Sequence, residues 1–524
     1  MLYVRIGMSD ITESNKRIAK NTLLLYVRMI LTMAVGLFTS RVIINTLGVN
    51  DYGVYNVVGG IVTMISFLNN SMASASQRFI SFELGKGNQE TIKQVFSTSV
   101  STHLLLALVL FVVAETVGLW FLNAHMNIET SRMTAANWVY QCSIISLMLT
   151  IVSVPYNACI IAHEHMKAYA YISILEVILK LLIVYLLLII SHDKLIIYAV
   201  LVLIVALIVR IIYSMYCKYY FKECIYSFDT FDKRIFRDMF SFVGWNLLGT
   251  SSFVFKNQGA NIVLNLFFGT AINAARGIAF QVNAVITSFS NNFLMALKPQ
   301  ITKQYAEGNI ERSISLVYAG CRYSTFLMML ISIPFMINMD YLLRLWLGIV
   351  PPYTSIFLQF TLAAALFRTM ELPLITATYA TGKIRLSQLI IAVTNFSEIP
   401  IVYILLKAGG APYTAMYPTI IITFINVYAY IWCLKRVVPG YKLGYFVKNI
   451  ILRSFVIAAI CYCLSMYMRT FFSIDFQMFL LTSFLAFLIT SLVIYTFGFS
   501  RKEQKMLQEK SIAYFLTIYR RFFN

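Results

Sequence analysis

The sequence predicts an all-α polytopic membrane protein, and its composition and the spacing of its apolar segments support this prediction. Of the 524 residues, 59% are hydrophobic and only 12% are charged, and the mean hydropathy is +0.75. An average soluble domain is about 45–50% apolar and about 25% charged. The chain therefore has too few charged residues to cover several soluble domains, and the same composition excludes disordered, collagen-like and disulfide-stapled classes.

A membrane-spanning helix needs about 20 mostly apolar residues, and the chain contains about fourteen such segments. We expect the spans at 21–44, 53–77, 95–122, 134–158, 169–190, 195–217, 239–267, 271–297, 313–338, 354–378, 386–406, 412–434, 449–468 and 475–499. They predict two six-helix lobes related by a pseudo-two-fold repeat, plus two extra C-terminal helices. The expected parts are a cytoplasmic N-terminus at 1–20, an N-lobe at 21–217, a basic linker at 218–238, a C-lobe at 239–434, the added helices at 449–499 and an amphipathic cytoplasmic tail at 500–524.

The distribution of cations supports this span count. The chain has 42 Lys and Arg against 22 Asp and Glu, a formal charge of +20. Cytoplasmic loops of membrane proteins collect Lys and Arg. With the N-terminus placed inside, 28 cations fall in inside segments and 5 in outside loops. This asymmetry predicts that both termini are cytoplasmic, and it explains the basic charge without a nucleic-acid partner.

Two parts of the sequence resemble each other at an offset of about 220 residues. Phe67-Leu-Asn-Asn70 is matched by Phe289-Ser-Asn-Asn292, and Gly87-Asn88 is matched by Gly308-Asn309. An offset of six helices gives both copies the same orientation in the membrane, as in transporters whose halves are related by an axis along the membrane normal.

Polar residues recur on one face of the repeated helices. Such faces avoid lipid, because an unsatisfied polar group is costly there. They point either at a neighbouring helix or at a hydrated cavity, and we expect the cavity. The expected lining amides are Asn56, Asn70, Asn257, Asn261, Asn273, Asn283 and Asn291.

Nine cations lie inside the expected helices, and each is costly at mid-membrane. Arg28, Arg41, Lys256 and Arg276 lie in repeated helices that hold no acidic residue within their spans. They predict a cationic cavity for an anionic ligand, because guanidinium groups bind phosphate oxygens bidentately. The alternative is structural pairing, and the carboxylates available for pairing or ion coupling are Glu115, Glu176, Glu371 and Glu398.

The sequence predicts no metal site, no cofactor and no catalytic constellation. The eight cysteines contain no C-x-x-C pair and are interpreted as packing residues, with Cys224 as a reduced thiol in a cytoplasmic loop. His163-Glu164-His165 is interpreted as a solvated cytoplasmic loop, because residues two apart do not share a helix face.

The residues around the first expected span resemble Wzx-type polysaccharide flippases, a family within the superfamily of MATE exporters and the MurJ flippase. The likeness rests on Ser40-Arg41, the pattern Leu47-Gly48-x-x-Asp51-Tyr52-Gly53, and the run Gln77-Arg78 to Gly87-Asn88. It implies two V-shaped lobes and alternating access. It also implies an undecaprenyl-pyrophosphate-linked oligosaccharide as cargo, flipped to the outer leaflet of the bacterial inner membrane for O-antigen, capsule or exopolysaccharide synthesis.

The resemblance further implies other polysaccharide assembly proteins as partners, and cavity cations that meet the pyrophosphate. A cation-coupled MATE-type exporter and a lipid II flippase are alternatives within the same fold. A membrane glycosyltransferase or polymerase is a weaker alternative, because the longest expected outside loop, 338–353, holds a single Asp.

Overall fold

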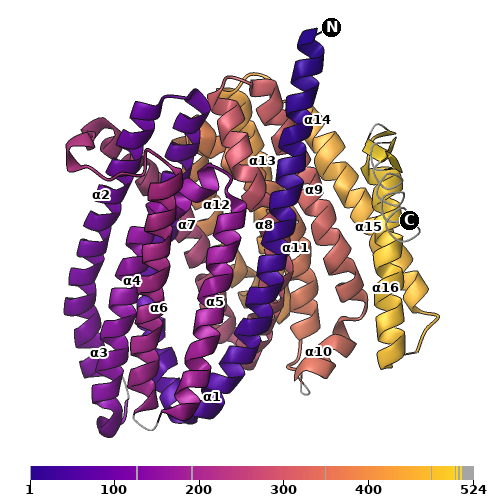
Figure 1. Cartoon of the computed structure of the whole chain (residues 1–524). Helices are drawn as coiled ribbons and strands as arrows, with labels where there is room; N and C mark the ends of the chain where they lie inside the picture. Colours follow the sequence, from indigo (N-terminus) through magenta and orange to yellow (C-terminus); the bar gives the residue numbers. More distant parts are fainter. Residues whose placement is uncertain are drawn as a thin grey trace, which may run out of the picture. The chain divides into compact units, whose positions relative to one another are not determined.

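The computed structural model describes residues 2–505 and 508–509, with gaps at 126–127, 191–192, 269, 348–349, 474 and 502. Side chains are left out for residues 2–19 and for parts of 37–70 and 265–274. Every regular element in the described part is helical (Figure 1). The expected all-α class is therefore confirmed.

Most helices coincide with expected spans. They are α2 (Gln89–Val113), α3 (Leu119–His125), α4 (Met133–Ala162), α5 (Met166–Ile189), α6 (Lys194–Tyr220), α7 (Lys233–Phe268), α8 (Thr270–Ala306), α9 (Ile310–Ile337), α10 (Met339–Leu347), α11 (Thr354–Thr381), α12 (Arg385–Lys407), α13 (Met416–Val437), α14 (Leu443–Phe446), α15 (Arg453–Arg469) and α16 (Phe476–Val493). π-helical turns at Ala114–Gly118, Val447–Leu452 and Ile494–Gly498 continue three of these helices. Among the described residues, ten helices are long and apolar enough to cross a membrane.

The first element differs from expectation. Residues 21–44 and 53–77 were expected to form two helices, whereas the structure has one helix, α1 (Leu2–Lys86). A straight helix of this length would measure roughly 130 Å, about four times the thickness of a bilayer core. Figure 1 shows the ribbon running down from the N-terminus and turning at its far end, so two crossings remain compatible with one helical element.

The described chain separates into two compact units whose boundaries differ from the lobe boundaries expected from the repeat. The end of α8 and the end of α11 belong to the unit that holds the N-terminal helices. Unit 1 comprises Met1–Thr250, Met295–Ser313 and Tyr379–Gln388; unit 2 comprises Ser251–Leu294, Ile314–Thr378 and Leu389–Asn524.

The repeat motif appears in unit 1 as two equivalent turns. Gly87 follows α1 with φ of 76°, and Gly308 follows α8 with φ of 81°. Both therefore end a helix in the left-handed conformation, which glycine adopts without strain. Asn88 then caps α2, because its side chain accepts a hydrogen bond of 3.2 Å from the amide of Thr91. The two Gly-Asn pairs thus share a conformation as well as a sequence.

The ends of α1 and α8 pack closely within unit 1. A Cβ atom added to Gly85 would lie 2.7 Å from the Cβ of Ala306 and 2.7 Å from the carbonyl oxygen of Lys303. Nearby, Arg78 Nε donates a 2.8 Å hydrogen bond to the carbonyl oxygen of Tyr379. These contacts explain why segments distant in sequence form one unit.

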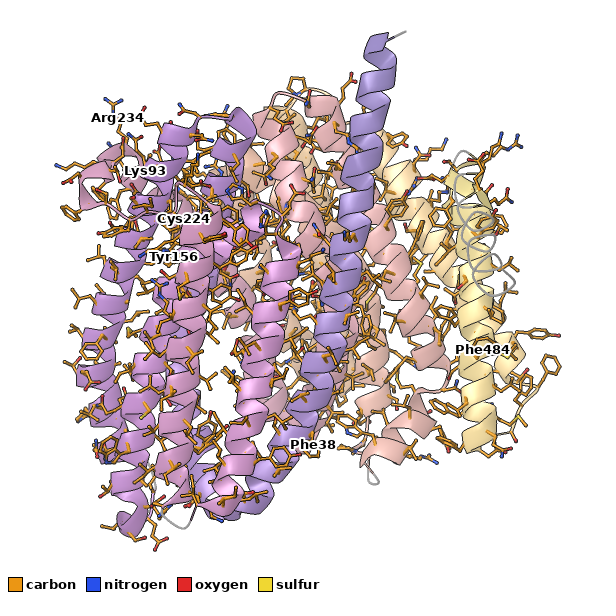
Figure 2. The ribbon with its side chains drawn as sticks, in the orientation of Figure 1. Phe38, Lys93, Tyr156, Cys224, Arg234 and Phe484 are labelled. Carbon is orange, nitrogen blue, oxygen red and sulfur yellow. The ribbon has the colours of Figure 1, made fainter. Side chains whose placement is uncertain are left out.

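An ion-pair cluster joins three helices at one end of unit 1. Lys93, Arg234 and Cys224 lie toward one end of the unit, and Phe38 lies toward the other (Figure 2). At the end expected to face outward, Arg132 Nε bonds Asp51 at 2.8 Å, and Arg132 Nη1 bonds Asp193 at 2.8 Å. This cluster joins α1, the start of α4 and the start of α6.

The corner between α4 and α5 is not the solvated loop that the sequence suggested. Glu164 is buried, has a φ of 62°, and accepts hydrogen bonds from Gln300 at 2.6 Å and Lys303 at 2.9 Å. His163 and His165 flank it. The reason for the difference is long-range: the end of α8 supplies the donors, and no local pattern reveals that approach.

Unit 2 has its own apolar core between α7, α8, α9, α11, α12 and the start of α13. The short helix α10 lies in the segment expected to be an outside loop. It begins at Met339, which is buried in this core together with Leu343. Two apolar residues one turn apart therefore make this loop helical.

Candidate functional site

The candidate site is a cavity of about 270 Å³ inside unit 2. Helices α7, α8, α11 and α13 supply its walls. Its lining residues are Phe253, Lys256, Asn257, Phe280, Asn283, Thr287, Asn291, Thr361, Ala364, Ala365, Arg368, Thr369, Leu372, Met416, Thr419 and Thr423. The cavity thus combines two cations, three amides and five hydroxyl groups with aromatic and aliphatic walls.

Lys256 lines the cavity from α7 and forms an ion pair beneath its surface. Its Nζ lies 3.3 Å from an oxygen of Glu398 on α12, and the two side chains are 4% and 0% exposed. The other Glu398 oxygen accepts a 2.7 Å hydrogen bond from the hydroxyl of Thr419 on α13. Three helices therefore meet at one buried carboxylate, whose charge balances the lysine.

Lys256 was expected to lack an acidic partner, because its own helix holds no acid within the span. The structure corrects this expectation: the partner, Glu398, comes from α12, and structural pairing was the alternative interpretation. An unpaired charge inside a membrane costs several kcal/mol, roughly 2.5–3.5 on insertion scales. That cost explains why a helix 142 residues further along the chain supplies the carboxylate.

Arg368 is the second cation of the cavity and the more exposed one. Its Nη1 lies 2.6 Å from Glu371, one turn along α11, and the two side chains are 36% and 1% exposed. The guanidinium carbon also lies 4.7 Å from the centre of the Phe253 ring. The described lining includes both cations but neither carboxylate, so the cavity wall presents positive groups with the balancing acids buried behind it.

A network of polar side chains holds α7, α12 and α13 together behind the wall. Asn395 on α12 donates to the hydroxyl of Ser252 on α7 at 3.0 Å and accepts from Asn426 on α13 at 3.3 Å. Asn426 in turn accepts a 2.7 Å hydrogen bond from Thr394. Because each hydrogen bond satisfies a polar group away from water, the network fixes these helices rather than exposing polar surface to lipid.

Arg276 on α8 is buried but does not line the cavity. Its Nη1 donates to the carbonyl oxygen of Asn257 at 3.2 Å and to the side chain of Asn261, and its guanidinium lies 4.4 Å from the centre of the Phe280 ring. These contacts join α8 to α7. Of the expected amides, Asn257, Asn283 and Asn291 line the cavity, while Asn261 is the partner of Arg276.

The other expected site residues lie elsewhere or outside the described side chains. Arg28 belongs to unit 1, with its guanidinium 4.8 Å from the centre of the Tyr169 ring. The expected binding roles of Arg41, Asn56, Asn70 and Asn273 fall on side chains outside the described part, as does most of the expected amphipathic tail.

The four candidate carboxylates each have a partner. Glu398 forms an ion pair with Lys256, and Glu371 forms an ion pair with Arg368. Glu176 holds Lys180 at 2.6 Å, and Glu115 accepts a 3.0 Å hydrogen bond from Gln141. Pairing with a cation, one of the two roles considered, is seen for Glu176, Glu371 and Glu398, whereas Glu115 bonds an amide.

The sequence reading missed some of the cavity. Arg368 was not among the four cations singled out in the sequence, and its pairing with Glu371 one turn away does not prevent it from lining the cavity. Thr361, Thr419 and Thr423 were missed entirely, since a threonine inside an apolar helix commonly bonds its own backbone. Thr361 shares α11 with Arg368, and Thr419 and Thr423 lie one turn apart on α13, so the spacing of threonines along these two helices is the signal that could have found them.

A second cavity, of about 430 Å³, lies in unit 1 among residues expected at the cytoplasmic face. It is lined by Arg78, Phe79, Asp238, Ser241, Phe242, Trp245, Thr381, Gly382, Lys383, Ile384 and Arg385. Most of these residues are outside the expected spans, so the unit 2 cavity remains the candidate for cargo at membrane depth.

Solved structures show which fold the chain has. An outward-facing multidrug resistance MATE family transporter of the MOP superfamily has a TM-score of 0.66 and 12% identity, over 80% of this chain and 95% of that chain. A Vibrio cholerae MATE transporter has a TM-score of 0.62 and 18% identity, over 81% and 98%. A MOP superfamily transporter from Pyrococcus furiosus, described by the reverse polarity of its binding pocket, has a TM-score of 0.63 and 13% identity, over 80% and 95%.

At the level of sequence, none of the curated proteins matches the chain. A family described as "Polysaccharide biosynthesis protein" matches residues 18–304, more than half of the chain. That range contains the Arg41 and Gly87-Asn88 motifs and both repeated helix pairs. The chain therefore belongs to the polysaccharide biosynthesis protein family and is a multi-pass membrane protein with the fold of the MATE transporters.

Proposed function

We propose that this protein is a flippase that carries a lipid-linked oligosaccharide, joined through pyrophosphate to undecaprenol, from the cytoplasmic to the outer leaflet of a bacterial inner membrane. The observation that carries the proposal is the polarity of the unit 2 cavity. Its wall presents Lys256 and Arg368, while Glu398 and Glu371 lie buried behind them. A wall of this kind suits an anionic cargo and disfavours a cationic drug.

The chemistry of the wall fits both parts of such a cargo. The guanidinium of Arg368 can bind two phosphate oxygens at once, and it is the more exposed of the two cations. Asn257, Asn283, Asn291 and the threonine hydroxyls offer donors and acceptors for sugar hydroxyls. The cavity of about 270 Å³ holds only a small part of an oligosaccharide, so the polyprenyl chain stays in lipid in this mechanism.

The transport step needs no covalent chemistry. The cavity opens to one leaflet at a time, and the membrane potential drives an anion outward by about 2.3 kcal/mol per charge per 100 mV. Arg28, Arg41 and Arg276 stay as predicted contacts of the cargo at other stages of the cycle. Membership of a polysaccharide biosynthesis family supports the class of cargo. Other assembly proteins are proposed partners.

The test replaces Arg368 while preserving the charge balance. In cells whose surface polysaccharide depends on this chain, we expect Arg368→Gln with Glu371→Gln to lower polysaccharide delivery about tenfold or more at unchanged protein level. A hydrogen bond to a charged group contributes about 1.5–3 kcal/mol, and 1.4 kcal/mol corresponds to a factor of ten. Arg368→Lys should retain only part of the activity.

The matched control is Arg453→Gln. Arg453 is also a cation in a unit 2 helix, but its Nε donates to the carbonyl oxygen of Phe497 at 2.8 Å, away from the cavity. It should deliver polysaccharide within about twofold of the parent. Full delivery by the Arg368 and Glu371 double variant would contradict the proposal. Export of a cationic drug by the parent chain, abolished by Glu398→Gln, would favour the MATE-type alternative.

A further inference from the structure

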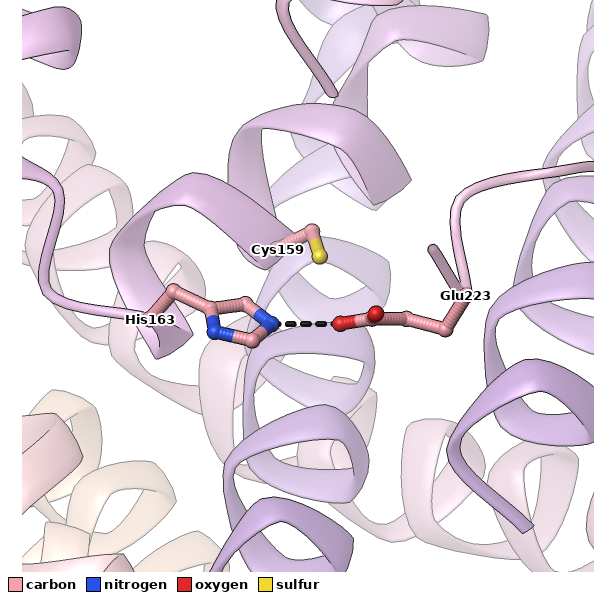
Figure 3. A group of neighbouring side chains, drawn as sticks. All are labelled: Cys159, His163 and Glu223. Carbon is pink, nitrogen blue, oxygen red and sulfur yellow. Dashed lines mark hydrogen bonds and ion pairs between the residues drawn. The ribbon is translucent and has the colours of Figure 1, made fainter. Parts of the chain in front are cut away.

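Three side chains of metal-ligating type converge in unit 1, far from the cavity in sequence and outside the proposed transport mechanism. The Sγ of Cys159, Nε2 of His163 and a carboxylate oxygen of Glu223 all lie within 4.8 Å of one another (Figure 3). Cys159 and His163 come from the end of α4, and Glu223 comes from the segment after α6. The group is therefore built from two parts of the chain that lie 60 residues apart.

Local structure holds the three groups toward a common point. Cys159 and His163 are four residues apart, so both side chains project from one face at the end of α4. The ring of Phe221 stacks on the imidazole of His163, with centroids 4.1 Å apart and planes inclined by 12°. This contact orients the ring so that Nε2 faces the carboxylate of Glu223 at 2.5 Å.

A second thiol lies next to this group. The Sγ atoms of Cys224 and Cys159 are 3.2 Å apart, and both residues are fully buried. The separation is much longer than a disulfide bond of about 2.05 Å. The contact is a hydrogen bond that the Cys224 thiol donates to the sulfur of Cys159, so Cys224 holds Cys159 in place. Cys224 follows Glu223 directly, so one short segment supplies both a member of the group and a support for Cys159.

We infer that Cys159, His163 and Glu223 bind one divalent transition-metal ion of the zinc class. One sulfur, one imidazole nitrogen and one carboxylate oxygen form a three-ligand set that suits zinc with a water molecule as the fourth ligand, whereas magnesium and calcium prefer sites built from oxygen alone. The side chains of His163 and Glu223 are 23% and 14% exposed, so solvent provides an entry path. A bound ion would displace the hydrogen bond between His163 and Glu223 and sit between them.

Such an ion would stabilise the corner between α4 and α5, which already contacts the end of α8. Glu164 follows His163 in the chain and accepts hydrogen bonds from Gln300 and Lys303. Fixing His163 to the segment after α6 therefore limits the movement of Glu164, which binds the end of α8. The proposed role is structural and does not depend on the proposed cargo.

The test uses the full chain in detergent, treated with a chelator and titrated with Co²⁺ as the probe. We expect one Co²⁺ per chain and a thiolate-to-cobalt absorption band in the near ultraviolet. His163→Asn and Glu223→Gln should weaken Co²⁺ binding at least about tenfold, as expected for the loss of one metal ligand. Cys159→Ser should abolish the thiolate band.

Two matched controls come from the same chain. His165→Asn removes a neighbouring imidazole that bonds the hydroxyl of Tyr216 instead, and Cys463→Ser removes an exposed thiol; both should bind Co²⁺ like the parent. If Cys159→Ser fails to fold, His163→Asn decides the result. No thiolate band in the parent, or a band unchanged in His163→Asn, would overturn the inference and leave the proposed transport function untouched.

Discussion

The ion pairs at the helix ends of unit 1 and those beside the cavity of unit 2 place opposite charges in different kinds of position. In unit 1, Arg132 meets Asp51 and Asp193 at helix ends, and Lys303 meets Glu164 at a corner. In unit 2, Lys256 and Arg368 meet their carboxylates within helices and beside a cavity. Charges at helix ends can remain partly hydrated, whereas charges in mid-helix need a partner. Among these pairs, the two beside the cavity are therefore the ones that demand a functional explanation.

The largest effect is expected at the buried pair of unit 2. Lys256→Met leaves the Glu398 carboxylate buried with no cation, and breaking a buried pair costs about 3–5 kcal/mol. The midpoint of thermal unfolding of the purified protein should fall accordingly. Lys256→Met combined with Glu398→Gln should recover most of the stability, because no lone charge remains. Equal midpoints for the single variant and the parent would remove the distinction between the two kinds of pair.

An intermediate effect is expected at the corner of unit 1. Glu164→Ala removes the acceptor for Gln300 and Lys303 at a site that is buried but close to a helix end. Leaving a buried donor without a partner costs about 1–3 kcal/mol. Glu164→Gly should be less damaging than Glu164→Ala, because φ is positive at this residue. Chemical denaturation can rank the two variants, and the reverse order would contradict this account.

The smallest effect is expected at the partly exposed outer cluster. Burial raises the pKa of Asp193, but hydrogen bonds from Arg132 and from the amides of Ile196 and Leu195 outweigh it and hold that pKa below its usual value. A carboxyl whose pKa is lowered on folding adds stability above its unfolded pKa, near 3.9, and loses it as pH falls through the folded value. Asp193→Asn should therefore cost less than about 1 kcal/mol at neutral pH.

The pH dependence distinguishes this cluster from a mere packing contact. Below about pH 4 the parent loses the contribution of Asp193, so the parent and Asp193→Asn should converge in stability as the pH falls further. A stability difference that stays constant from neutral to acidic pH would show that the carboxylate charge contributes nothing. The comparison requires unfolding curves for both proteins at several pH values.

Most of the helices could be predicted because their signals are local. A run of about 20 apolar residues identifies α5 or α6 without any knowledge of its neighbours. The turns at Gly87 and Gly308 were also recognisable, since glycine followed by asparagine is a local signal for ending one helix and starting another. The sequence did not reveal that the first two expected spans join into α1. The predicted break at 45–52 rested on a few polar residues, and a helix tolerates such residues.

The site was predictable only in part, for the opposite reason. Lys256, Asn257, Asn283 and Asn291 were found because a polar residue in an apolar helix is visible in the sequence. Glu398 was recognised as a carboxylate available for pairing, but its pairing with Lys256 could not be assigned and Thr419 was missed, because both residues come from helices more than 130 residues away. The group of Cys159, His163 and Glu223 was missed for the same reason, since spacing within His163-Glu164-His165 says nothing about Glu223.

The close packing around Gly85 limits which substitutions this position can accept during evolution. A side chain of any size there would collide with Ala306 and with the backbone at Lys303. Substitutions at this position should therefore be selected against, whichever sugars the protein transports. A saturation mutagenesis survey should find Gly85 as intolerant of substitution as a binding residue. Intolerance at Gly85 would then reflect the fit between two backbones and should not be mistaken for a record of cargo preference.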